Sequence, residues 1–539
     1  MRRWIAVLAL LAALFPAPAR AQWPASGLRL DGGGQRSYDQ VSIVPDGVGR
    51  FVVYYTAYSN THVVCGAQRG AMDGTSDTAW HDWELFAPVS DGSHEYFVGT
   101  FGPQNTWDVF HMSSGSFDPS WPSPALQVAS NDFPIVAPDS AGGCFVITNT
   151  PAYTLWRYTS TGTPAPLWPD SGVALGGTSP QLVVDALGRA VVLLLDDSNR
   201  LTSVRVLPDG TRDPAWAGAV LASLGSSSLR TTRWFADGDG YWLVWSDALT
   251  HATRVAADGT VAAGWPVTAV AAADDAFASP SHLRAFPDGI GGLFVLLNPG
   301  TQDGHLAAPV YATHLKSDGS VAPGWSLPGA QLSMPVTGTL NVASFIAGPD
   351  SLGGCFVGWG GRLTRLLDDH TPAPGWSGAG DAPQATHDMV YGSCSYGGPA
   401  AIGSLNAVMG DGTGAALIAL AVYDNCSYPF QVLRLVRFTP PGLAGVAPAA
   451  RRARPGLRLV GPNPSTRRSR FALALEARIP ATFEVLDVAG RVVSREFVVP
   501  GAAERELDWA APGTARAGVY FARLTQRGRS ATARFVTLP

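Results

Sequence analysis

Acidic side chains are the first place to look for chemistry in this chain of 539 residues. A glycoside hydrolase needs two carboxylates at one site, and a Ca²⁺ loop needs several oxygen ligands in series. Most Asp residues here stand instead in Asp-x-x-Gly or Asp-Gly turns, where Asp bonds its own backbone and Gly accepts positive φ. We therefore predict a structural role for them and no catalytic residue. Asp237 and Asp411 are the candidate Ca²⁺ positions, and no other cofactor is expected.

Cysteines and histidines offer little further chemistry. Cys144 and Cys355 both stand in Gly-Gly-Cys-Phe-Val, so we expect them in separate repeats as small buried side chains. Cys394 and Cys426 flank a single repeat and could form a disulfide in an oxidising compartment. No Cys or His spacing is typical of a metal site. The sequence also has no G-x-S-x-G, H-E-x-x-H or P-loop motif.

The Asp-x-x-Gly phrase is itself repeated, and an apolar run follows each copy. Successive copies begin roughly 45 to 62 residues apart, a period typical of propeller blades. The pairs are Asp46/Gly49, Asp139/Gly142, Asp185/Gly188, Asp237/Gly240, Asp288/Gly291, Asp350/Gly353 and Asp411/Gly414, with a degenerate copy near Asp91. A second turn in most copies ends at a tryptophan: Trp80, Trp121, Trp168, Trp216, Trp265, Trp325 and Trp376. A single four-stranded sheet, formed by one copy of the repeat, cannot bury both of its apolar faces. Several such sheets stacked around an axis can bury them against one another.

The repeats predict an all-β fold, an eight-bladed β-propeller followed by a small Ig-like β-sandwich. Seven blades are the alternative, because the stretch between Trp80 and Trp121 has hardly room for an outer strand. The segment from Trp23 resembles the outer strands that follow the other tryptophans, yet no blade precedes it. We therefore expect it to complete the last blade and close the ring, which removes exposed strand edges.

Composition divides the chain into four parts. Residues 1–21 have two arginines, an apolar core and Ala-Arg-Ala, the pattern of a secretory signal peptide. Residues 22–442 are the predicted propeller, 443–456 are a Pro/Ala/Arg linker, and 457–539 contain short alternating strands. No segment is apolar over the length of a membrane span. The mature protein is therefore expected to be exported.

Charge is unevenly distributed along the chain. The formal net charge is −5, but from Arg451 onward there are 16 Arg against seven acidic residues. These arginines alternate with apolar residues along strands, which predicts a solvated strand face rather than a nucleic-acid site. No nucleic-acid partner is expected.

The last segment resembles the type A C-terminal sorting domain of type IX secretion cargo, which is similar to the Ig-like domain of the flagellar hook-capping protein. Order, spacing and C-terminal position match together over about 83 residues. The motif residues are Pro462, Asn463, Pro464, Asp487, Gly490, Arg491, Gly518 and Tyr520, with Leu-Asp-Trp at 507–509 between them. The resemblance implies passage through the outer membrane by the type IX machinery, then removal of this domain and release or surface attachment.

These features favour a secreted or cell-surface propeller that binds a glycan or protein without catalysis. A propeller hydrolase or lyase acting on polysaccharide is one alternative, and a structural protein of the cell envelope is another. Seventeen tryptophans could serve either packing or ligand stacking, and packing is favoured for Trp242 and Trp245.

Overall fold

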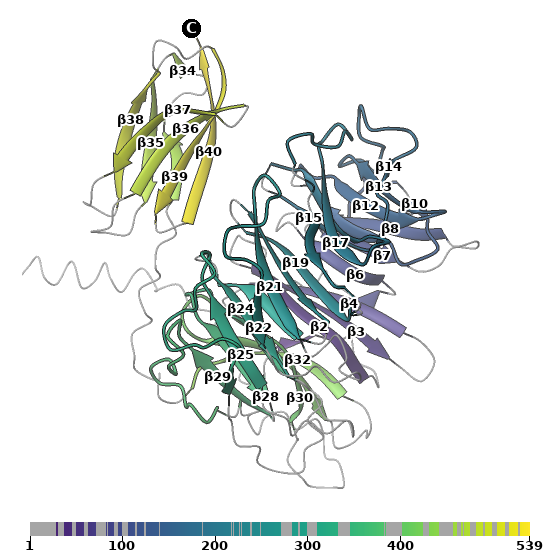
Figure 1. Ribbon diagram of the computed structural model, residues 1–539, viewed down its shortest axis with the longest axis vertical. Coiled ribbons are helices and arrows are strands. Elements are labelled where there is room, and N and C mark those ends of the chain that lie inside the picture. The colour runs from purple at the N-terminus through teal and green to yellow at the C-terminus, as the bar shows by residue number, and fades with distance from the viewer. Residues whose placement is uncertain are drawn as a thin grey trace, which may run out of the picture.

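Figure 1 shows a computed structural model in which every described element is a β-strand. It describes most of the chain between residues 28 and 538. Outside the described residues lie 1–27, 31–36, 72–81, 100–105, 271–282, 299–309, 333–344, 384–401, 424–430, 441–455, 475–480, 499–503, 512–516, 539 and shorter gaps of one to four residues. Within the described part, no helix is long and apolar enough to span a membrane.

The described strands between Leu28 and Phe438 form eight antiparallel sheets, each built mainly from consecutive strands. The first strands are β2 (Ser37–Pro45), β6 (Leu85–Ser90), β11 (Ile135–Pro138), β15 (Thr178–Val184), β19 (Thr231–Asp237), β23 (Leu283–Pro287), β27 (Ile346–Pro349) and β30 (Ile402–Gly410). The second strands are β3 (Arg50–Tyr58), β7 (Glu95–Gly99), β12 (Cys144–Asn149), β16 (Ala190–Leu195), β20 (Gly240–Ser246), β24 (Leu293–Leu297), β28 (Cys355–Trp359) and β31 (Ala416–Tyr423).

The third strands are β4 (Val63–Ala71), β8 (Thr106–Ser113), β13 (Tyr153–Tyr158), β17 (Arg200–Val206), β21 (Thr250–Ala256), β25 (Val310–Leu315), β29 (Arg362–Leu366) and β32 (Gln431–Phe438). The outer strands are β5 (Asp82–Trp83), β10 (Leu126–Ala129), β14 (Val173–Ala174), β18 (Val220–Ser223), β22 (Val267–Val270) and β26 (Ala330–Leu332), with β9 (Ser116–Phe117) an extra strand on β8. The sheet of β27 to β29 has three described strands. The stretch after Trp80 thus contains an outer strand of only two residues.

The sheets follow one another around a closed ring. First strands of neighbouring sheets contact each other from β6 through β11, β15, β19, β23 and β27 to β30, β30 contacts β2, and β4 contacts β6. Apolar cores lie between consecutive sheets, so the second strand of a sheet is buried on both faces. The apolar runs predict this burial, and in β16 residues 190–194 are all buried. This is a β-propeller.

The N-terminal segment closes that ring. Strand β1 (Leu28–Arg29) pairs with β32 and is the outer strand of the last sheet. Leu30 follows it and packs in one core with Phe51 of the first sheet and Leu435 of the last. The predicted closure by this segment is confirmed.

The C-terminal part has two further sheets. One contains β33 (Gly456–Val460), β35 (Arg468–Ala474) and β38 (Glu504–Ala510) in that order. The other has the order β34 (Ser465–Thr466), β40 (Arg529–Leu538), β39 (Gly518–Gln526), β36 (Ala481–Asp487) and β37 (Val492–Val498). Phe471 and Trp509 of the first sheet share a core with Phe483 and Phe535 of the second, so the two sheets form a sandwich.

Candidate functional site

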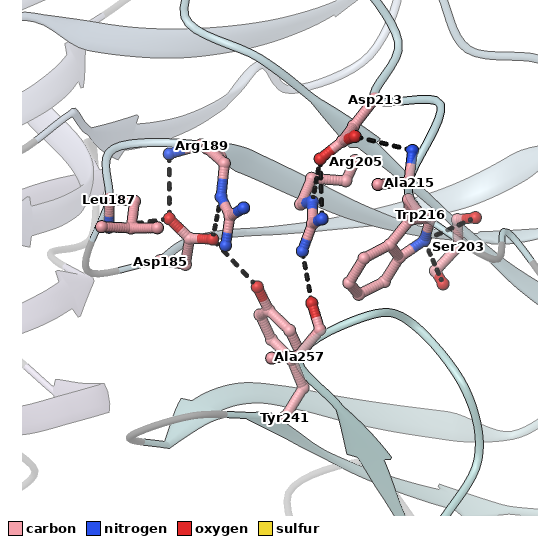
Figure 2. Close-up of polar contacts among 10 residues, drawn as sticks. All are labelled: Asp185, Leu187, Arg189, Ser203, Arg205, Asp213, Ala215, Trp216, Tyr241 and Ala257. Carbon is pink, nitrogen blue, oxygen red and sulfur yellow. Dashed lines mark hydrogen bonds and ion pairs between the residues drawn. The ribbon is translucent and has the colours of Figure 1, made fainter. Parts of the chain in front are cut away.

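The Asp-x-x-Gly carboxylates are used by their own hairpins. Asp185 Oδ1 accepts hydrogen bonds from the backbone amides of Leu187 (2.9 Å) and Arg189 (3.0 Å). Its Oδ2 accepts from Arg189 Nε at 2.7 Å and from the Tyr241 hydroxyl of the next sheet at 3.2 Å, as Figure 2 shows. Gly188 supplies the positive φ of 72° that closes the turn. Burial, together with this carboxylate, raises the pKa of Tyr241 to about 12.

A basic side chain on the third strand, arginine in four sheets and histidine in one, contacts each of the other described hairpin carboxylates. The pairs have N–O distances between 2.7 and 3.5 Å and are Arg157–Asp139, Arg254–Asp237, His314–Asp288, Arg365–Asp350 and Arg437–Asp411. The two candidate Ca²⁺ positions, Asp237 and Asp411, are therefore each paired with an arginine, which would compete with a metal ion for the carboxylate. In the described part of the chain no group of three or more His, Cys, Asp or Glu residues could hold a metal.

Arg205, the corresponding residue of β17, bridges two sheets instead (Figure 2). It forms an ion pair of 2.6 Å with Asp213 and donates to the Ala257 carbonyl in the second turn of the next sheet. Its guanidinium lies 4.6 Å from the ring centroid of Trp216, which suits a cation–π contact. Arg157 likewise donates to the Pro208 carbonyl of the next sheet at 2.8 Å. Arg157 and Arg205 thus connect neighbouring sheets, a contact that the sequence spacing did not reveal.

In several sheets, a glycine of the second turn lies against the tryptophan of the preceding sheet. A Cβ added to Gly259 would lie 2.7 Å from the Trp216 ring, and one added to Gly210 would lie 3.2 Å from Trp168 and 2.4 Å from Pro169. Both glycines have positive φ, 88° and 82°. The glycines in these turns therefore permit both the turn conformation and close contact between sheets.

Replacing Gly210 by alanine is expected to destabilise the propeller by about 1–3 kcal/mol, because the left-handed backbone and the close contact both oppose a Cβ. Urea unfolding of the full chain followed by tryptophan fluorescence measures the loss. Gly225→Ala is the matched control, since Gly225 has φ of 58° but nothing within 4 Å of an added Cβ. Equal losses in the two variants would show that backbone strain alone matters.

The remaining sequence candidates in the propeller are either buried in its core or lie outside the described residues. Cys144 and Cys355 are buried free thiols at the starts of equivalent strands in separate sheets, as predicted, and burial raises the pKa of both. Trp242 and Trp245 are buried in the core, which confirms the packing interpretation. The described anchors Trp121, Trp168, Trp216, Trp265, Trp325 and Trp376 are buried too. Cys394, Cys426 and Trp80 lie outside the described residues, so the disulfide stays a prediction.

The described motif residues of the C-terminal segment gather at one end of the five-stranded sheet. Asp487 lies opposite Tyr520, and Gly518 lies opposite Thr537 near the chain end. Ser465 pairs in parallel with Thr537, which brings the start of the segment to the same end. The preceding residues Pro462, Asn463 and Pro464, and also Gly490, lie outside the described residues. Four stretches far apart in the sequence therefore meet here.

Asp487 and Arg491 form the same hairpin contacts as Asp185 and Arg189. Asp487 Oδ1 accepts from the Arg491 amide at 3.0 Å, and Oδ2 accepts from Arg491 Nε at 2.8 Å. The Arg491 side chain is 81% exposed, whereas Arg189 is 21% exposed. Only Nε of the Arg491 side chain bonds the Asp487 carboxylate, so most of the guanidinium faces solvent.

Glu484 links two other arginines on the outer face of the same sheet. Its side chain is largely buried and pairs with Arg495 and Arg523 at 2.6 Å each. Burial opposes ionisation, but the hydrogen bonds from Arg523 and Arg495 outweigh it and hold the pKa of Glu484 below its ordinary value.

A carboxylate with a lowered folded-state pKa stabilises the fold above its unfolded pKa, and this stability disappears as pH falls through the folded pKa. We expect the sandwich of wild type to lose stability on acidification from pH 7 to below pH 4. Glu484→Gln should be less stable at pH 7 and show a flatter pH dependence. Calorimetry of the full chain at several pH values tests this, and parallel pH curves for the two proteins would contradict it.

No protein-family model and no curated protein matches this chain. Among solved structures, a fungal alcohol oxidase of the AA5 family in complex with copper has 10% identity and a TM-score of 0.37, covering 94% of this chain and 100% of that one. PorZ, a surface component of the type IX secretion system of Porphyromonas gingivalis, has 11% identity and a TM-score of 0.24, covering 95% and 86%. The β-propeller domain of the Trilobed protease from Pyrococcus furiosus has 7% identity and a TM-score of 0.32, covering 75% and 98%. None of these similarities is close enough to transfer an activity.

Proposed function

We propose that this protein is an exported or surface-attached propeller that binds a glycan or protein without catalysis and carries a C-terminal type IX sorting domain. Its eight sheets would be eight blades, and its C-terminal sandwich would be the Ig-like sorting unit. The observation that carries the proposal is the gathering of Ser465, Asp487, Gly518 and Tyr520, which belong to or directly follow the motif stretches, at one end of that sandwich. The export machinery would recognise this end of the sandwich as a single surface.

The propeller supports a binding role better than a catalytic one. Its repeated carboxylates are held in hairpins and paired with third-strand cations, an arrangement that builds blades. A glycosidase would need two carboxylates placed on either side of a scissile bond. Propeller loops can bind ligands on a rigid ring.

Deleting residues 457–539 tests the sorting role in a host with a working type IX system. The truncated protein should accumulate in the periplasm, whereas the full chain should reach the surface or medium, as measured by fractionation and immunoblotting. A full chain with the exposed Leu187 changed to alanine is a suitable control. Normal export of the truncated protein would refute the sorting role.

A further inference from the structure

The outer face of the five-stranded sheet of the sandwich carries a row of apolar side chains. Strand register aligns Val492 of β37 with Leu486 of β36, Leu486 with Phe521 of β39, and Phe521 with Arg534 of β40. The alternate residues of these strands, including Phe483, Val485, Tyr520, Ala522 and Phe535, form the core. Because side chains alternate across a strand, the aligned row points away from that core.

More apolar side chains extend this row toward the end where the motif residues gather. Val519 lies opposite Val536 in the same alternation. Val488, Val492 and Leu538 are 74%, 45% and 43% exposed. A contiguous apolar area on a soluble sheet is typical of an interaction site.

Arginines border the apolar row along one side. The neighbouring row runs Arg495, Glu484, Arg523 and Thr532 across the four strands. Glu484 is nearly buried beneath Arg495 and Arg523, whose side chains are 55% and 41% exposed. With Arg534 also exposed, the accessible charge of this face is positive. Ion pairing to Glu484 fixes two guanidinium groups, which suits them to bind carboxylates.

We propose that this outer face, defined by Leu486, Val492, Phe521 and Arg534 with the bordering arginines, docks an acidic protein surface that also supplies apolar side chains. The partner would belong to the export machinery, so this inference rests on the proposed sorting function. We commit to a protein rather than an anionic membrane, because Glu484 holds two guanidinium groups in place to pair with carboxylates. Protein–protein interfaces are also typically composed of arginines around a partly buried apolar centre.

Two substitutions in the full chain test the docking face. Arg534→Glu reverses an exposed charge, and Phe521→Ser removes the largest apolar side chain of the row. Each should lower the exported fraction at least about tenfold, a loss of about 1.4 kcal/mol in docking, with matching periplasmic accumulation. Arg468→Glu is the control, since Arg468 is also an exposed strand arginine but lies on the other sheet. Calorimetry of each purified variant must show the wild-type sandwich transition.

The outcomes separate this proposal from the sorting role. If deletion of 457–539 blocks export but folded Arg534→Glu and Phe521→Ser variants are exported like wild type, the docking face is wrong and the sorting role stands. If deletion does not block export, the sorting role itself fails. Wild-type binding to phosphatidylglycerol vesicles that Arg534→Glu abolishes and Arg468→Glu retains would assign the face to lipid and overturn the protein partner.

Discussion

Removing residues 22–30 is expected to destabilise the propeller by roughly 3–5 kcal/mol and to cause self-association. The deletion removes β1 and with it the pairing of Leu28 to Leu435 and the 3.0 Å hydrogen bond from the Leu30 amide to the Leu433 carbonyl. It also removes the buried Leu30 side chain from the core shared by the first and last sheets. Strand β32 would then become an exposed edge.

Urea unfolding and gel filtration of the deleted chain measure both effects. Tryptophan fluorescence reports mainly on the propeller, since Trp509 is the only tryptophan after residue 451. Leu30→Ala isolates the packing contribution and should cost about 2–4 kcal/mol, whereas Leu187→Ala, at a side chain 69% exposed, should change stability by less than about 0.5 kcal/mol. An unchanged midpoint and a monomeric deleted chain would show that the ring does not depend on this segment.

The repeated turns could be predicted from sequence because their chemistry is local. Asp185, Gly188 and Arg189 lie within five residues, and among the described residues of the turn every hydrogen bond of the Asp185 carboxylate except the one from Tyr241 comes from Leu187 or Arg189. The closure by the segment that contains Leu30 could also be predicted. The last repeat lacked an outer strand, and the N-terminal segment resembled an outer strand with no blade before it.

The partner that each turn carboxylate finds on the third strand of its own sheet could not be predicted in the same way. Arg365 reaches Asp350 across 15 residues, but Arg437 reaches Asp411 across 26 because the loop between their strands is longer. No fixed spacing therefore identifies the pair. The third-strand cation can even change partner, as Arg205 does by pairing with Asp213.

The docking face depends on strand register, which sequence alone does not fix. A register shift between Val485 and Leu486 in the β36–β37 pairing places Val492 opposite Leu486. Without this irregularity, Val493 would stand opposite Leu486, and Val493 packs against the core instead. The alternation of arginine and apolar residues predicted a solvated face but not its composition.

Replacing Trp216 by alanine is expected to cost about 3–5 kcal/mol, because the indole fills the junction between two sheets. It is 7% exposed, packs edge to face on Tyr241 with centroids 5.5 Å apart, and lies beneath Gly259. Its Nε1 donates to Ser203 oxygens at 3.2 and 3.3 Å. Trp216→Phe keeps an aromatic ring and should lose only about 1–2 kcal/mol.

A double-mutant cycle between Trp216→Ala and Arg205→Ala then tests how the junction works. The guanidinium that lies over the indole also holds the Ala257 carbonyl of the next sheet, so the two losses should be coupled by about 0.5–3 kcal/mol. A single transition in urea with a lowered midpoint is expected for each variant, since a sheet that loses its neighbour cannot bury its own apolar face. Additive losses would mean that the arginine and the tryptophan stabilise the junction independently. Two separate transitions of the propeller itself, apart from that of the sandwich, would mean that the ring unfolds sheet by sheet, and closure would then contribute little to its stability.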